Sequence, residues 1–170
     1  MKREILFRGF HPDQNGTQVV VVNGKEYKGK WIEGDLLSKC KGSPKISING
    51  EYNRGLFVVD SYEVIPDTVG QWTGLTDKNG KKIFEGGRVR YGKRIDFDCH
   101  EESIRYPEAY GGKIYDIGIF EDVVVWYGEN GYPAFDIENH DMECNAFSEI
   151  SSSGDYVIEV IGTIFDKEEV

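Results

Sequence analysis

Three Asn-Gly dipeptides, Asn23-Gly24, Asn49-Gly50 and Asn79-Gly80, constrain the fold of this 170-residue chain more than any other feature. Asn and Gly tolerate the positive φ angles of the tight turns that join antiparallel strands, so an Asn-Gly pair between two apolar runs predicts a β-hairpin. The flanking runs are short and rich in β-branched and aromatic residues, as in the run from Val19 to Val22. We therefore expect a chain of hairpins, with each Asn-Gly pair at a turn.

Alternating and apolar runs along the rest of the chain predict about a dozen short strands and no long helix. The 21 glycines fit a fold with many turns. The sequence therefore predicts an all-β fold built mainly of short antiparallel strands and hairpins. The expected strands are 4–9, 19–22, 25–27, 31–37, 45–48, 56–59, 62–65, 71–75, 82–84, 88–91, 113–120, 123–127, 134–138 and 156–165.

A few positions carry more specific expectations. Gly34 lies inside a strand, where glycine commonly marks a bulge or a close approach of two backbones. Residues 66–69 can form one helical turn, since proline at the first position loses no hydrogen bond. Residues 93–110 are expected to form a long loop, with a short helix around 101–106 as an alternative. Residues 139–149 are polar and acidic, and 151–154 are expected to form a loop. Glu159 alternates with apolar residues, so it belongs at a rim or on an edge strand.

The length favours one domain, residues 1–170, with two lobes at 1–75 and 76–170. Within the second lobe, the pattern from Phe84 to Phe165 is analogous to a small SH3-like barrel with a long first loop. No uncharged apolar window is long enough to span a bilayer, and the first ten residues lack the apolar core of a signal peptide. Three cysteines suit free thiols in a reducing compartment. We expect a soluble, cytoplasmic protein with no membrane partner.

Charge is distributed unevenly along the chain, whose net charge is −10. Residues 1–75 have a net charge of +1, residues 76–95 of +5, and residues 96–170, with 19 acidic and 3 basic side chains, of −16. One interpretation is charge complementarity between the basic and acidic parts, within one chain or between subunits. The other is a nucleic-acid footprint confined to the basic part, because affinity for phosphate comes mostly from clustered Lys and Arg.

The basic part forms a predicted hairpin, and its cations are the candidate binding surface. Trp72, Phe84 and Tyr91 are available to stack on bases if this surface binds nucleic acid. Alternatively, these aromatic residues belong to the core, and the cations guard exposed strand edges against pairing. The candidate residues are Lys78, Lys81, Lys82, Arg88, Arg90, Lys93 and Arg94.

No catalytic or metal-binding frame is evident. Cys99, His100, His140 and Cys144 contain two kinds of zinc ligand, but the adjacent Cys99 and His100 would point to opposite faces of a strand. Pairs of carboxylates can serve a hydrolase, yet some pairs are expected from the abundance of acidic residues alone. We expect no enzyme activity, no metal and no cofactor. The carboxylates considered are Asp116, Glu121, Asp122, Asp136 and Glu138.

Four stretches together resemble the YopX family of bacteriophage and prophage proteins: REILFRGF near the start, GKWIEGDLL at 29–37, the segment 67–91, and YVIEVIGTIFD at 156–166. The family usually has Glu-Gly-Asp after the aromatic residue of the third stretch, and this chain has Glu85-Gly86-Gly87 instead. A catalytic role at Gly87 is therefore not expected, because glycine offers no functional group. The resemblance implies a phage or prophage accessory protein and no particular reaction.

The sequence thus supports three hypotheses of different kinds. The first is a phage or prophage accessory protein that acts as a non-catalytic binding module, with an unknown partner from host or phage and possible homo-oligomers. The second is a nucleic-acid-binding protein that uses the hairpin from Lys78 to Arg94. The third is an enzyme of unrecognised type.

Overall fold

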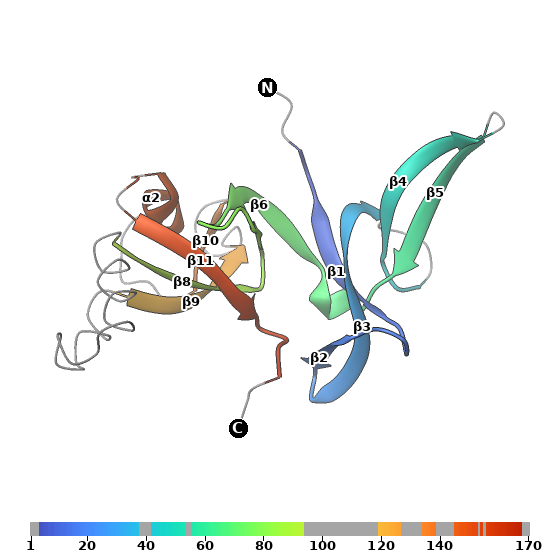
Figure 1. Cartoon of the computed structure of the whole chain (residues 1–170), viewed down its shortest axis with the longest axis horizontal. Coiled ribbons are helices and arrows are strands. Elements are labelled where there is room, and N and C mark those ends of the chain that lie inside the picture. Colours follow the sequence, from blue (N-terminus) through green and yellow to red (C-terminus); the bar gives the residue numbers. More distant parts are fainter. Residues whose placement is uncertain are drawn as a thin grey trace. The chain divides into compact units, whose positions relative to one another are not determined.

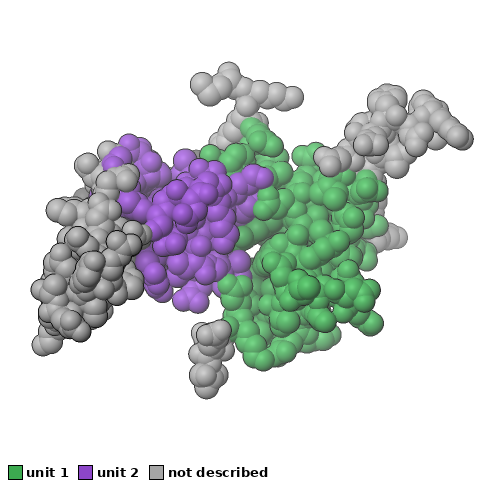
Figure 2. All heavy atoms as spheres, in the orientation of Figure 1, with its two compact units in different colours: residues 1–74, 164–170 green, residues 75–163 purple. Residues whose placement is uncertain are grey.

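The computed structural model describes residues 4–37, 42–53, 56–93, 119–126, 134–138, 145–152, 154 and 156–167, with the backbone alone at 49–53, 56–59, 93, 119 and 149. Over these residues the chain is built mainly of antiparallel strands, so the all-β prediction is confirmed. The chain divides into two compact units (Figure 2). Unit 1 contains residues 1–74 and 164–170, and unit 2 contains residues 75–163.

Unit 1 is organised around one long strand, β3, which pairs with three others (Figure 1). Residues 25–29 of β3 pair with β2, residues 29–34 with β1, and residues 35–37 with β4. The strand order is β5-β4-β3-β1-β6, and β2 joins β3 beside this path. The elements are β1 (Phe7–Pro12), β2 (Gln18–Val22), β3 (Lys25–Leu37), β4 (Lys45–Asn53), β5 (Leu56–Glu63), the 3-10 helix η1 (Pro66–Thr68) and β6 (Gly70–Thr76).

Two local predictions for unit 1 are confirmed. Residues 66–68 form η1 with proline in its first turn, and the Val69 amide donates to Pro66 O at 3.1 Å. Gly34 lies where β3 passes close to β4, since a Cβ there would collide with Ser47 O. Glycine at this position therefore allows the two backbones to approach each other.

The Asn-Gly predictions are only partly right. Asn23 and Gly24 both have positive φ angles, 51° and 75°, and form the tight turn between β2 and β3. Asn79-Gly80 forms the turn between β6 and β7. Asn49-Gly50 does not form a turn, because β4 runs through it with a shift of register between Ile48 and Gly50. A bulge also exploits the freedom of glycine, so the dipeptide was misinterpreted.

The C-terminal segment of the chain completes the core of unit 1. Phe165 packs against a cluster that contains the fully buried Phe10 together with Val20 and Val22. The Val21 amide donates to Phe165 O at 2.8 Å, which anchors the segment beside β2. Unit 2 is therefore an insertion in the sequence of unit 1.

Unit 2 contains a four-stranded antiparallel sheet of order β10-β9-β8-β11. One hydrophobic cluster joins the sheet to helix α2, with Val89, Val124, Phe147 and Ile158 among its members. Over the described residues the sheet does not close, so the SH3-like barrel is not confirmed. The elements are β7 (Lys82–Phe84), β8 (Gly87–Lys93), β9 (Ile119–Trp126), β10 (Phe135–Ile137), α2 (Ala146–Ser152) and β11 (Tyr156–Thr163).

Helix α2 lies where the sequence analysis found only a polar, acidic stretch at 139–149 and a loop at 151–154. Asn145 caps it, since its Oδ1 accepts the Ser148 amide at 2.6 Å. Asp136 Oδ1 accepts the Phe147 amide at 3.0 Å, so a residue eleven positions earlier satisfies a second free amide of the first turn. A seven-residue helix is too short to be stable alone, and this one depends on contacts that the local sequence does not reveal.

Strand β9 also corrects the sequence analysis. The two strands expected at 113–120 and 123–127 are one strand across the described residues 119–126. The acidic pair Glu121-Asp122 does not break it, because Glu121 lies directly opposite Arg90 of β8. A cross-strand ion pair offsets the low strand propensity of a carboxylate. No helix in the described part of the chain is long and apolar enough to cross a membrane.

Candidate binding surface

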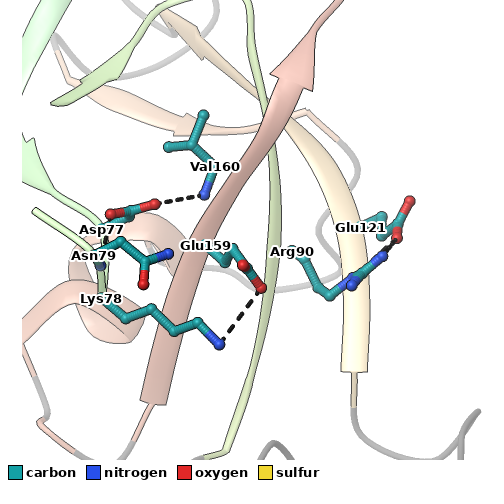
Figure 3. A network of polar contacts seen from close by, with 7 residues as sticks. All are labelled: Asp77, Lys78, Asn79, Arg90, Glu121, Glu159 and Val160. Atoms are coloured by element: carbon teal, nitrogen blue, oxygen red, sulfur yellow. Dashed lines mark hydrogen bonds and ion pairs between the residues drawn. The ribbon is translucent and has the colours of Figure 1, made fainter. Parts of the chain in front are cut away.

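The turn at 77–81, at the start of the predicted basic hairpin, is held in place by the carboxylate of Asp77. Its Oδ1 accepts the backbone amides of Asn79 and Lys81, both at 2.8 Å. Its Oδ2 accepts the Val160 amide of β11 at 3.0 Å (Figure 3). The Lys78 amide donates to Ile158 O at 2.9 Å. The turn thus supplies one donor and one acceptor to the edge of β11 that faces away from β8.

This arrangement has an electrostatic consequence for Asp77, whose side chain is buried. Burial raises the pKa of its carboxyl group. The hydrogen bonds from Val160, Lys81 and Asn79 and the charge of Lys81 together lower the pKa by more, so it lies below the ordinary value. Asp77 therefore carries a negative charge that the fold stabilises. Asp77 also covers the free edge of β11. The alternation around Glu159 predicts this strand to lie at a rim or an edge.

Three of the seven predicted surface cations lie against carboxylates of unit 2. Lys78 Nζ is 3.5 Å from Glu159 Oε2. Arg90 donates from Nε and Nη2 to Glu121 Oε1, at 3.0 and 2.7 Å (Figure 3). Arg88 Nη2 lies 3.7 Å from Glu121 Oε2. The strand register sets Arg90 directly between Glu159 and Glu121 on the two neighbouring strands.

The other four predicted surface cations are Lys81, Lys82, Lys93 and Arg94. Lys81 is exposed and Lys82 is partly buried. The side chain of Lys93 and the whole of Arg94 lie outside the described residues. Lys78, Arg88 and Arg90 thus face acidic partners from the C-terminal part of the chain. Such contacts are what the charge-complementarity interpretation expects within one chain.

The three aromatic residues considered for base stacking have different environments. Phe84 is 2% exposed and belongs to the interior. Trp72 is partly buried. Tyr91 is partly buried and packs against the core of unit 2. Tyr91 also stacks on the exposed ring of Phe120, with ring centroids 5.6 Å apart and planes inclined by 27°.

The sequence analysis did not single out the two aromatic side chains that are most exposed among the described residues of unit 2. Phe120 is 55% exposed and Trp126 is 45% exposed. Both occupy even-numbered positions of β9, which share one face of the strand. The middle of that face is buried, because Val124 lies in the cluster that includes α2. Strand alternation from Phe120 to Trp126 was a usable signal, but the supposed break at Glu121-Asp122 concealed it.

Two of the carboxylates considered for hydrolysis are buried in unit 2. Asp122 is 9% exposed and Asp136 is fully buried. Asp122 Oδ1 accepts the Val123 amide, and Asp136 Oδ1 accepts the amides of Ile137 and Phe147. The pKa of the Tyr91 hydroxyl is raised. Burial is the main cause, and Asp122, Asp136 and Tyr156 add to the shift electrostatically. These two carboxylates and the two tyrosines therefore lie within electrostatic reach of one another.

The two other described carboxylates do not join this group. Glu138 is exposed, and Glu121 pairs with arginine as described above. Asp116 and the metal candidates Cys99, His100, His140 and Cys144 lie outside the described residues. Within the part of the chain that the structure describes, no group of three or more His, Cys, Asp or Glu side chains could hold a metal ion.

The architecture defines a two-unit antiparallel β-protein whose smaller sheet presents exposed aromatic rings beside buried carboxylates. The family model described as YopX protein matches residues 24–170, which is most of the chain, so the chain belongs to the YopX family. Neither the comparison with curated proteins nor that with solved structures gave a match.

Proposed function

We propose that this chain is a phage or prophage accessory protein of the bacterial cytoplasm that works as a non-catalytic binding module. Family membership supports the general class. The observation that carries the binding role is the exposure of Phe120 and Trp126, 55% and 45%, on one face of β9. Single exposed apolar residues are common, whereas large aromatic rings are enriched at protein interfaces.

Packing around these two rings supports the same role. Phe120 stacks on Tyr91, and Trp126 makes an edge-to-face contact with Phe135 at 5.1 Å between centroids. Each exposed ring is therefore supported by a second ring and loses little freedom on binding. Anchors of this kind lower the entropic cost of association. The partner is a protein of the host or the phage, or a second copy of this chain.

The experiment is an affinity capture with three versions of the tagged chain: wild type, Phe120→Ala, and Val19→Ala as control. Val19 is 43% exposed on β2 of unit 1, so its truncation removes exposed apolar surface from unit 1 and leaves β9 intact. We expect a stoichiometric partner with wild type and Val19→Ala that is depleted with Phe120→Ala. The same captured set with all three versions would disprove the role of β9.

Self-association needs a separate measurement, namely size-exclusion chromatography with light scattering at low and high salt. If β9 mediates oligomers, the mass should fall to that of a monomer in Phe120→Ala and stay unchanged in Val19→Ala. A monomer at both salt concentrations in the wild type would leave a different protein as the partner. In that case the capture experiment alone decides.

A further inference from the structure

The stacked rings of Tyr91 and Phe120 can bind a cation. Over half of the Phe120 side chain is exposed although its ring stacks on Tyr91. The strand register places Tyr91 directly opposite Phe120, so two neighbouring strands fix the pair. The face of an aromatic ring attracts cations, and the planar guanidinium of arginine stacks on such rings especially well.

The surroundings of the stack are acidic. Asp122 follows Phe120 by two positions on the same face of β9, and its charge acts on Tyr91 together with that of the buried Asp136. The arginines of β8 do not compensate there, because Arg88 and Arg90 alternate with Tyr91 and meet Glu121 on the opposite face. The whole segment 96–170 carries 19 acidic and 3 basic side chains. This field favours a basic partner and repels phosphate.

We propose that the Tyr91–Phe120 stack, with Asp122 beside it, receives an arginine side chain from a basic segment of a partner protein. The proposal rests on the binding function proposed above and specifies the chemistry of the partner. Phe120 supplies the ring surface, Tyr91 holds that ring in place, and Asp122 supplies negative charge. The interface thus combines a rigid aromatic anchor with a charge that selects the partner.

The test uses the full chain and a fluorescent peptide of alternating arginine and serine, with a citrulline peptide of the same length as its uncharged counterpart. Binding is followed by fluorescence anisotropy at low and high salt. We expect the arginine peptide to bind, and the citrulline peptide to bind at least about five times more weakly. Phe120→Ala should weaken binding of the arginine peptide by about three- to tenfold, and Phe120→Trp should preserve it.

Three further variants separate the local site from general charge. Asp122→Asn should weaken binding, whereas Glu138→Gln removes one exposed negative charge elsewhere in unit 2 and should change the affinity little. Lys93 occupies the position two residues after Tyr91 on β8, so Lys93→Gln should leave binding equal or tighter. Circular dichroism and the melting temperature verify that each variant is folded.

The peptide measurements test the arginine site separately from the binding module. Absence of peptide binding, equal binding of both peptides, or equal binding by Phe120→Ala would overturn the arginine site. Tighter binding of a single-stranded oligodeoxynucleotide than of the arginine peptide would overturn it as well. If the partner captured by the wild type is still lost in Phe120→Ala, the binding module stands while the arginine site fails.

Discussion

Each unit buries a charged side chain, and the two cases differ in how the protein accommodates the charge. Unit 2 buries Asp77 and unit 1 buries Arg8, both 7% exposed. The pKa is lowered in both, but the meaning is opposite. For the carboxyl group a lowered pKa means that the fold favours the charged form, whereas for the guanidinium it means that the fold disfavours it.

The surroundings explain the difference. Asp77 accepts three backbone amides, which favour the carboxylate more than burial opposes it. Burial lowers the pKa of Arg8 to about 10, and the charges of Glu33 and Asp166 offset this only in part. The guanidinium also lies 4.9 Å from the centre of the Trp31 ring. A buried carboxylate is thus stabilised when three backbone amides donate to it, whereas burial of the Arg8 guanidinium outweighs the favourable charges of Glu33 and Asp166.

The largest effect should come from Asp77→Ala. Three amides would lose their acceptor, and a hydrogen bond to a charged group contributes about 1.5–3 kcal/mol, so we expect unit 2 to lose about 3–5 kcal/mol. Urea denaturation measures the loss. Hydrogen exchange locates it, since the Val160 amide should exchange much faster.

The control for this variant lies in the same turn. Asn79→Ala keeps the Asn79 amide that donates to Asp77, and the residue does not have a positive φ. It should change stability by about 0.5 kcal/mol or less. Comparable losses in the two variants would show that the turn itself, rather than the carboxylate, stabilises β11.

Acid should weaken the protein through the same group. Because the pKa of Asp77 is lower in the folded protein than its ordinary value of 3.8, its contribution is complete above the ordinary value and is lost as the pH falls through the folded value. We expect the melting temperature of the wild type to fall more steeply between pH 5 and pH 2 than that of Asp77→Asn. Parallel profiles would assign the acid sensitivity to other carboxylates.

Arg8→Met should have a smaller effect, of about 1 kcal/mol or less in either direction. Methionine preserves much of the apolar contact, and the two carboxylates that act on Arg8, Glu33 and Asp166, are exposed, so the replacement leaves no buried unpaired charge. Both folded and unfolded chains carry the Arg8 charge below about pH 10, so the difference from wild type should not vary between pH 5 and pH 8. A loss above 3 kcal/mol in urea denaturation would mean that Arg8 is as well accommodated as Asp77.

The smallest effect is expected for Lys78→Gln. The ion pair with Glu159 is partly exposed, with both side chains at 29%, and such pairs contribute about 0–1 kcal/mol. The Lys78 amide still donates to Ile158 O in the variant, so β11 remains covered. Thermal unfolding at 0.05 and 1 M salt should show that the small difference from wild type disappears at high salt. A difference that persists would indicate lost packing instead of lost charge.

The candidate surface could be predicted only in part. Clustered cations in 76–95 were evident from the sequence, and so was the acidic excess that follows them. The partners were not evident, because Glu121 lies 31 positions beyond Arg90 and Glu159 lies 81 positions beyond Lys78, and only the folded chain brings each pair together. The exposed rings of β9 were missed for a related reason, since their exposure depends on where α2 covers the sheet.

The sequence by itself determined the strand-rich character of the chain, two of its tight turns and its family. These depend on local properties: β-branched and aromatic runs, positive φ angles at Asn-Gly, and motifs in order along the chain. Only the tertiary structure decided that Asn49-Gly50 lies inside a strand, that α2 forms, and which cations have acidic partners. Each of these depends on groups far apart in the sequence, whose interaction energies arise only once the chain brings them together.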